Sequence, residues 1–178
     1  MPNYCECWLS VESEDNASAK IVLAAVKSEN SDSAFDFGRV IPYPAEWRKM
    51  DNAAQEWREK SNAYIGKPWA QVLSEIGPRP EDAYNHGGYE WCLENWGTKW
   101  NAIEPTIEES DLWRTIIKFR TAWSPPLPVI DKLAEMFPNV CFRLEYYERG
   151  MEFCGSVFWD EGRRASETSG KYYGFRGG

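Results

Sequence analysis

The residue types that could form a binding site are concentrated in two short stretches near the middle of the chain. The first runs from 95 to 101 and reads Asn-Trp-Gly-Thr-Lys-Trp-Asn, and the second runs from 121 to 126 and reads Thr-Ala-Trp-Ser-Pro-Pro. Amide, hydroxyl and cationic groups around an aromatic floor commonly hold an anionic or planar ligand. The candidate binding residues are Asn95, Trp96, Thr98, Lys99, Trp100, Arg120 and Trp123.

The same stretches have a structural interpretation, which we favour because clustered indoles mostly serve packing. We expect their three tryptophans to cover the sheet face opposite the helices, beside Trp8 and Trp159. Lys99 and Asn101 would then satisfy nearby carbonyls and caps. In this arrangement the indoles form a lid over the sheet and leave no platform for bases or substrate.

Residues suited to catalysis or metal binding are scarce. The chain has one histidine, His86, and contains no G-x-S-x-G, P-loop or H-E-x-x-H pattern. Carboxylate pairs such as Glu148 with Glu152 could serve acid-base chemistry, but we expect them to be surface charges. Since Cys-x₂₋₄-Cys pairs are absent, we predict no metal, no cofactor and no catalytic residue. Five free thiols are expected, at Cys5, Cys7, Cys92, Cys141 and Cys154.

The charge of the whole chain bears on the class of partner. A formal net charge of −8 and a pI near 4.8 oppose broad attraction to phosphate backbones, so protein or small-molecule partners are favoured. Clustered carboxylates could also mimic phosphates and occupy the basic groove of a partner, although solubility accounts for the same residues. This acidic interaction surface would comprise Glu104, Glu108, Glu109 and Asp111, with a second group at Glu12, Glu14 and Asp15.

The sequence predicts a cytoplasmic protein that does not enter a membrane. It has no apolar run long enough to cross a bilayer, and its N-terminus lacks the basic-then-apolar pattern of a secretory signal. An odd number of irregularly spaced cysteines suits a reducing compartment.

The first third of the chain has alternating and helical patterns. Period-two alternation predicts a strand over 5–11, and an apolar stripe predicts a helix over 17–27 with Asn16 as its N-cap. Phe35, Phe37 and Ile41 alternate towards prolines and predict a short second strand. A tryptophan-containing helical hairpin, broken at 66–68, is expected within 45–76.

The remainder contains a strand at 112–121, a helix at 124–137 capped by Ser124, and strands at 140–147 and 151–159. Gly150 is expected to supply a positive φ for the hairpin between the last two strands. The tail, 162–178, is locally basic and rich in Gly and Ser, and we expect it to be mobile.

This order of elements predicts an α+β fold, a ferredoxin-like split β-α-β sandwich. A single domain would occupy 1–161, with a Trp-rich and largely helical insertion at about 45–111 between its two halves.

Several stretches resemble the YubB family of ferredoxin-like proteins, which occurs on phages, plasmids and integrated mobile elements. They are 1–5 (Met-Pro-Asn-Tyr-Cys), 41–42 (Ile-Pro), 95–101, 121–126, and 147–150 (Tyr-Glu-Arg-Gly) with Phe153 and Gly155. Tyr4 and Cys7 depart from the family, which has Trp and Asn at those places. The resemblance implies an α+β fold and a mobile-element origin, and it implies no characterised activity.

We therefore expect a non-enzymatic interaction protein that binds a host protein, with counter-defence as one possible role. The alternative is a single-stranded nucleic-acid binder that uses strand aromatics and the basic tail, where Lys171 to Arg176 reads Lys-Tyr-Tyr-Gly-Phe-Arg. An enzyme acting on a small ligand in the Trp96 and Lys99 region is the third hypothesis.

Overall fold

The structure is a computed structural model that describes residues 3–29, 33–110 and 113–174, without the side chains of Asn16, Glu109 and Ser110. The chain forms two compact units. The first contains residues 1–42 and 92–178, and the second contains residues 43–91.

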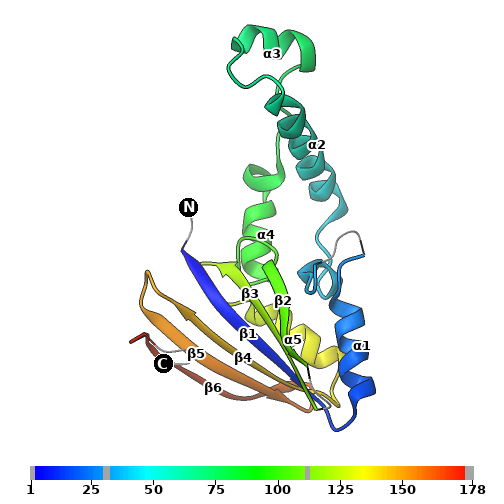
Figure 1. Cartoon of the computed structure of the whole chain (residues 1–178), viewed down its shortest axis with the longest axis vertical. Coiled ribbons are helices and arrows are strands. Elements are labelled where there is room, and N and C mark those ends of the chain that lie inside the picture. The colour runs from blue at the N-terminus through cyan, green and yellow to red at the C-terminus, as the bar shows by residue number, and fades with distance from the viewer. Residues whose placement is uncertain (1–2, 30–32, 111–112, 175–178) are drawn as a thin grey trace. The chain divides into compact units, whose positions relative to one another are not determined.

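The first unit is a six-stranded antiparallel sheet with the order β2-β3-β1-β4-β5-β6 (Figure 1). With α1 after β1 and α5 after β3, the strands β2, β3, β1 and β4 form the split β-α-β core of a ferredoxin-like domain, which confirms the predicted fold class. The elements are β1 Tyr4–Glu12, α1 Asn16–Val26, η1 Phe37–Arg39, β2 Ile103–Ser110, β3 Arg114–Ala122, α5 Leu127–Met136, β4 Cys141–Glu148, β5 Phe153–Asp160 and β6 Arg163–Lys171.

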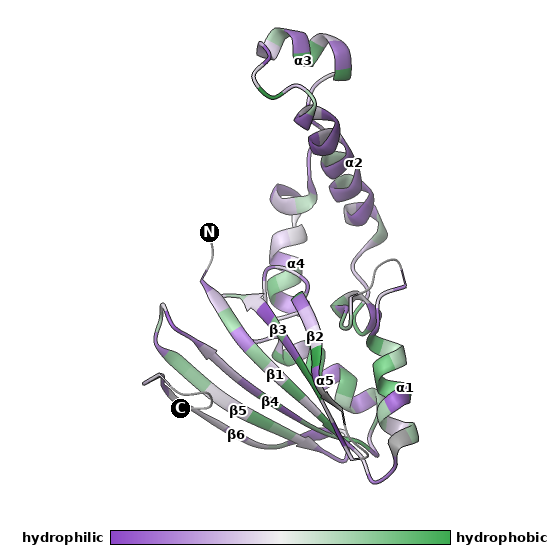
Figure 2. Cartoon of the chain, in the orientation of Figure 1, coloured by the Kyte–Doolittle hydropathy of each residue, from purple (hydrophilic) through white to green (hydrophobic). Residues whose placement is uncertain are grey.

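The core lies between the sheet and its helices because the strands alternate apolar and polar residues (Figure 2). Leu9 pairs in register with Ile117 on one side and Leu144 on the other, and all three side chains are fully buried. Val157 pairs with Leu144, and Trp159 lies two residues later on the same face of the sheet. The indole N–H of Trp159 donates to the Asp131 carboxylate on α5 over 2.8 Å, so this face is the one that the helices cover. The prediction that Trp159 lies on the opposite face is therefore wrong.

The caps of the two helices differ from those predicted. Asp15 caps α1, since its carboxylate accepts from the Ser18 backbone N–H over 2.6 Å, and Asn16 is the first helical residue. The helix α5 begins at Leu127 after Pro126. Ser124 is not its cap, because the Ser124 hydroxyl donates to the Gly97 carbonyl over 2.6 Å.

The second strand is not where the sequence predicted it. Phe35 and Phe37 are both fully buried, but the backbone forms the 3₁₀ turn η1, capped by the Asp36 side chain. The strand that completes the split motif is β2, which falls inside the predicted insertion of 45–111. The separate unit is the shorter segment 43–91, and it is inserted between α1 and β2 rather than between the two halves of the fold.

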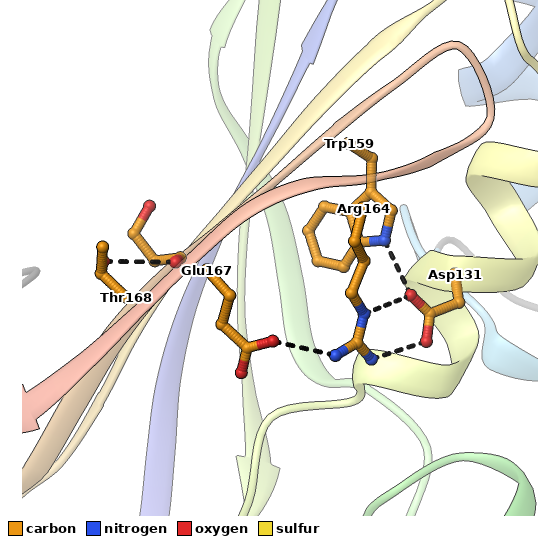
Figure 3. A network of polar contacts seen from close by, with 6 residues as sticks. Asp131, Trp159, Arg164, Glu167 and Thr168 are labelled. Atoms are coloured by element: carbon orange, nitrogen blue, oxygen red, sulfur yellow. Dashed lines mark hydrogen bonds and ion pairs between the residues drawn. The ribbon is translucent and has the colours of Figure 1, made fainter.

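The tail predicted to be mobile is in large part a strand. Residues 163–171 form β6, which pairs with β5 from Phe153↔Lys171 to Asp160↔Arg163. The Arg164 guanidinium anchors this strand through two hydrogen bonds to Asp131 on α5, Nε to Oδ1 at 2.6 Å and Nη2 to Oδ2 at 2.7 Å (Figure 3). Backbone pairing with β5 and this ion pair order residues 163–171, although their polar composition does not predict a strand. Residues 175–178 lie outside the described residues.

In the hairpin between β4 and β5, Gly150 is required because the Asn3 side chain lies too close for a Cβ atom. The positive φ belongs to Glu152, at 56°, and Gly150 is not among the residues with positive φ. A Cβ at Gly150 would collide with the Asn3 side chain. Close approach therefore requires the glycine, and the predicted left-handed conformation of Gly150 is wrong.

The second unit is helical, as predicted. It contains α2 Ala45–Asn62, α3 Trp69–Ile76 and η2 Ala83–His86, and α4 Gly88–Asn95 runs across its C-terminal boundary. Figure 2 shows that α2 is mostly hydrophilic along its length, and Ala54 is its buried residue. No helix within the described ranges is both long and apolar enough to span a bilayer.

Candidate functional site

Two of the predicted binding residues, Trp96 and Thr98, are structural. Trp96 is buried, donates its indole N–H to the Ile41 carbonyl over 2.9 Å and packs edge-on against Phe37. Thr98 is fully buried, and its hydroxyl donates to the Ala122 carbonyl over 2.8 Å and accepts from the Ala122 N–H over 3.1 Å. These contacts fasten the loop after α4 to the end of β3.

The predicted tryptophan lid over the open sheet face is wrong for Trp96. Trp96 contacts Phe37, and Phe37 contacts Phe119, which lies on the helix face of β3 two residues from Ile117. Trp96 therefore belongs to the core between sheet and helices. Periodicity could not show this, because it does not tell which side of a sheet a loop residue reaches.

Lys99 lies between two indoles at the end of β3. Its ammonium is 4.6 Å from the centre of the Trp100 ring and 5.1 Å from that of Trp123. Trp100 is exposed, and Trp123 has a φ of 71°, a conformation that bulky residues rarely adopt. Asn95, the last residue of α4, is half-buried. Lys99, Trp100 and Trp123 thus form a small cation–aromatic surface.

Arg120 is part of a neighbouring group on β3. Its guanidinium lies 4.8 Å from the Tyr4 ring centre and forms an ion pair with Glu104 on β2. Its charge is therefore shared between an aromatic ring and a carboxylate of the same unit.

The acidic interaction surface is largely neutralised where the structure describes it. Glu104 pairs with Arg120, and Glu108 lies 3.4 Å from the Lys118 ammonium. The side chain of Glu109 and the whole of Asp111 lie outside the described residues. Exposed ion pairs of this kind contribute little, so the phosphate-mimicry hypothesis for this surface stays a prediction.

The second acidic group lines a hollow. Glu12, Glu14 and Asp15 border a pocket of about 940 Å³ together with Asp160 and Glu161. Cys141 also lines it, and burial together with a hydrogen bond to Asp160 raises the pKa of this thiol to about 11. A concave arrangement does not protrude into the groove of a partner, and the raised pKa makes the thiol a poor nucleophile.

The sheet face opposite the helices carries an aromatic stack. Trp8 lies on this face, as predicted, whereas Tyr147 and Tyr172 are not among the residues that the sequence predicted there. Trp8 stacks on Tyr147 with ring centres 5.5 Å apart, and Tyr147 stacks on Tyr172 at 4.6 Å. Lys118 lies 5.5 Å from the Trp8 ring centre, and Arg149 lies 5.5 Å from that of Tyr147. Only 8% of Trp8 and 9% of Tyr147 is exposed, so the stacked rings shield one another from solvent.

Large apolar side chains are exposed where α2 turns into α3. Ile65 in the turn is 82% exposed, Trp69 at the start of α3 is 58% exposed, and Leu73 one helical turn later is 39% exposed. Trp69 and Leu73 are four residues apart and therefore share a face of α3. We call these three residues the apolar tip.

The apolar tip is held in place by polar contacts within the second unit. The Trp57 indole N–H donates to the Gly77 carbonyl over 3.0 Å, and its ring packs edge-on against Trp69. The Tyr64 hydroxyl donates to the Glu75 carboxylate over 2.8 Å. Donors to Glu75 lower the pKa of that carboxyl, and acceptance by Glu75 raises the pKa of the Tyr64 hydroxyl. A fixed helix end thus presents the exposed side chains.

Comparison with known proteins agrees with the architecture of the first unit. Residues 95–174 match the family model described as the ferredoxin-like domain in Api92-like protein. This region contains the strands from β2 to β6 and the helix α5. It begins at Asn95, so the tryptophan-rich loop that follows α4 lies within the Api92-like match.

A solved structure supports the same fold over the whole chain. The crystal structure of protein api92 from Yersinia pseudotuberculosis has a TM-score of 0.57 and 10% sequence identity, and the match covers 98% of this chain and 99% of that chain. At this identity the likeness shows the fold alone. None of the curated proteins matches the chain. The ferredoxin-like part of the YubB resemblance is confirmed, and the phage or plasmid origin stays a prediction.

Proposed function

We propose that this protein is a non-enzymatic interaction module that binds another protein through the apolar tip. The observation that carries the proposal is the exposure of Ile65, Trp69 and Leu73 on a helix end that Trp57 and Tyr64 hold in place. Clustered exposed apolar side chains mark interaction sites, and tryptophan is enriched among the residues that dominate binding energy.

The partner best suited to the tip has an apolar groove. Trp69 and Leu73 have the i, i+4 spacing of anchors that a helix inserts into such a groove. Preorganisation lowers the entropic cost of binding, because α3 is ordered before the partner arrives. Lys67 and Glu75 are exposed beside the anchors and would form a polar rim.

We infer the cellular setting of this protein from the sequence. The resemblance to YubB-like proteins supports an origin on a phage, plasmid or integrated element, with a bacterial host protein as the target and counter-defence as the role. Five free cysteines support a reducing compartment, such as the host cytoplasm.

The test is affinity purification from the host with matched variants. Ile65→Asp combined with Leu73→Asp should lose the partner recovered by the native chain, because a charge in an apolar groove is left unpaired. Ala53→Asp, at an exposed position on α2, should retain it. Circular dichroism checks that all variants keep their helical content, and recovery of the same partner by the double variant would refute the proposal.

A second candidate function is single-stranded nucleic-acid binding on the open sheet face. It is favoured by Lys118 and Arg149 beside the Trp8 and Tyr147 rings, and disfavoured by the low exposure of both rings. Removal of 162–178 would not test it cleanly, because that deletion removes β6 from the sheet. Lys118→Ala with Arg149→Ala should abolish binding of labelled single strands if this candidate is right, and should change nothing if the interaction is with protein.

A further inference from the structure

The two edges of the sheet are protected to different degrees. The edge strand β2 contains Pro105, two register shifts and a φ of 49° at Glu104, all of which hinder pairing with another strand. The opposite edge strand, β6, contains no proline, and its one register shift lies at its start, opposite Phe158 and Trp159. Residues 166–171 therefore form a regular ladder.

The outer edge of β6 is uncovered within the described residues. The strand order gives β6 a neighbour on one side only, and all nine of its residues are exposed. The strand is ordered even so, because Arg164 is fixed to Asp131, and Lys171 forms an ion pair with Glu152 at 3.0 Å. An ordered, accessible edge is the geometry required for strand addition.

The backbone hydrogen bonds identify which residues face outward. The Tyr172 N–H donates to the Glu152 carbonyl over 2.8 Å, so the backbone of residue 172 faces β5. Antiparallel pairs alternate between bonded and non-bonded types, so residues 170 and 168 also face β5. The N–H and C=O groups of Glu167, Ser169 and Lys171 consequently point away from the sheet.

We propose that this edge pairs with the β6 strand of a second copy of the chain, antiparallel and centred on Ser169. In this register the three outward-facing residues all find partners: Ser169 lies opposite Ser169 of the other copy, and Glu167 lies opposite Lys171. A two-fold axis repeats the Glu–Lys pair, so two opposite-charge pairs flank the centre. Two sheets would join into one continuous sheet.

Charge favours this register over one in which the two strands overlap along their whole length. Centring the pair on Glu167 would overlap the whole strand, but it would place Glu167 opposite itself and Arg163 opposite Lys171 twice. Like charges directly opposite one another are destabilising. The register centred on Ser169 avoids all of these pairs.

The dimer goes beyond the proposed function and does not depend on it. It would carry two copies of the helical unit, so that a partner with repeated sites would bind with higher avidity. Because few residues take part, we expect a weak, reversible association that sedimentation reveals as a dependence on concentration.

Sedimentation equilibrium of the full chain tests the dimer between roughly 1 µM and 1 mM. The average mass should rise with concentration from the monomer value of 20.6 kDa towards twice that value. Ser169→Pro should remain monomeric throughout, because proline removes an outward N–H and leaves the ladder with β5 intact. Ser169→Ala, the matched control, should associate like the native chain.

A charge exchange separates the interface from a general loss of stability. Glu167→Lys and Lys171→Glu should each reduce association, and the double variant should restore it, since Lys and Glu again lie opposite one another. The double variant does not repair the contacts of Glu167 with Arg164 or of Lys171 with Glu152, so rescue reports the contact between copies. A native chain that stays monomeric to the highest concentration, or a dimer that Ser169→Pro and the charge variants leave unchanged, would overturn the proposal.

Discussion

Arg164 of β6 and Asp131 of α5 form a two-pronged ion pair that fastens the last strand to the helical layer (Figure 3). Asp131 also accepts from the indole N–H of the fully buried Trp159. One carboxylate therefore joins an exposed edge strand to the core, and it explains why a polar C-terminal segment is ordered.

Asp131→Ala should destabilise the first unit by about 1–3 kcal/mol, because the Trp159 N–H loses its partner in a buried position. Urea unfolding followed by tryptophan fluorescence measures the change. Lys132→Ala on the same helix is the control, since its exposed ion pair with Glu135 should contribute little. Equal midpoints for the Asp131 variant and the native chain would contradict this role.

Thr98→Val should also cost about 1–3 kcal/mol, because it keeps the shape of the side chain but removes the hydroxyl that accepts from the Ala122 N–H in a buried site, while the Ala122 carbonyl still accepts from the Ser124 N–H. Thr98→Ser keeps the hydroxyl and should lose much less. Thermal unfolding of both variants compares them. If Val and Ser are equivalent, the tryptophan-rich loop is not held by this hydroxyl.

The attachment of α3 should weaken in acid. The pKa of Glu75 is lowered by hydrogen bonds from Gln71 and Tyr64, so its contribution is present above the ordinary value of 4.5 and is lost as pH falls through the folded pKa. Tyr64 has the opposite sign: its pKa is raised, and its contribution is lost as pH rises above 10 through the folded pKa. Protection factors in α3, which divide out the intrinsic pH dependence of amide hydrogen exchange, should be highest between these limits.

Glu59 provides a matched control for that experiment. It accepts from Gln55 four residues earlier, as Glu75 accepts from Gln71, and the tyrosine hydroxyl is the additional donor to Glu75. Glu75→Gln should reduce the acid dependence of exchange in α3, and Glu59→Gln should leave it unchanged. The same pH profile in both variants would exclude the proposed cause.

Cys141 should react slowly with iodoacetamide. With its pKa raised to about 11 from 9.0, the thiolate fraction at pH 8 falls about a hundredfold. A more basic thiolate is intrinsically more nucleophilic, so the net slowing should be about tenfold. Mass spectrometry of digested protein gives the rate, and Asp160→Asn should accelerate the reaction because it removes a nearby negative charge. Rapid labelling of the native thiol would contradict the raised pKa.

The sequence was informative where burial imposes a period. Leu9, Val11 and Ile117 alternate with polar residues, and the strands containing them were placed to within a few residues. The helical hairpin in the second unit was also located correctly, because Gly66 and Pro68 interrupt two helical patterns.

Strands at the edges escaped prediction for a physical reason. Both β2 and β6 are ordered by backbone pairing with one neighbour, and β6 buries no side chain on either face, so no apolar period reveals it. The converse error occurred at Phe35 and Phe37, which alternate like strand residues but are buried from an irregular segment and the 3₁₀ turn that follows it.

The candidate site shows the same limit. Residue types identified the tryptophan-rich loop, but only the register assigns Trp8 and Tyr147 to one face, where they stack. The apolar tip left a partial signal, since Trp69 and Leu73 lie among polar residues in a predicted helix. Their exposure depends on tertiary packing, which spacing alone does not encode.

Photo-crosslinking in living host cells tests the central claim most directly. A benzophenone amino acid at position 73 should trap one discrete partner, because Leu73 lies on the exposed face of α3. The same group at the exposed position 53 on α2 should trap none, and Ile65→Asp should abolish the product formed from position 73. Equal crosslinking from positions 53 and 73, or none from 65, 69 and 73, would contradict protein binding through the apolar tip.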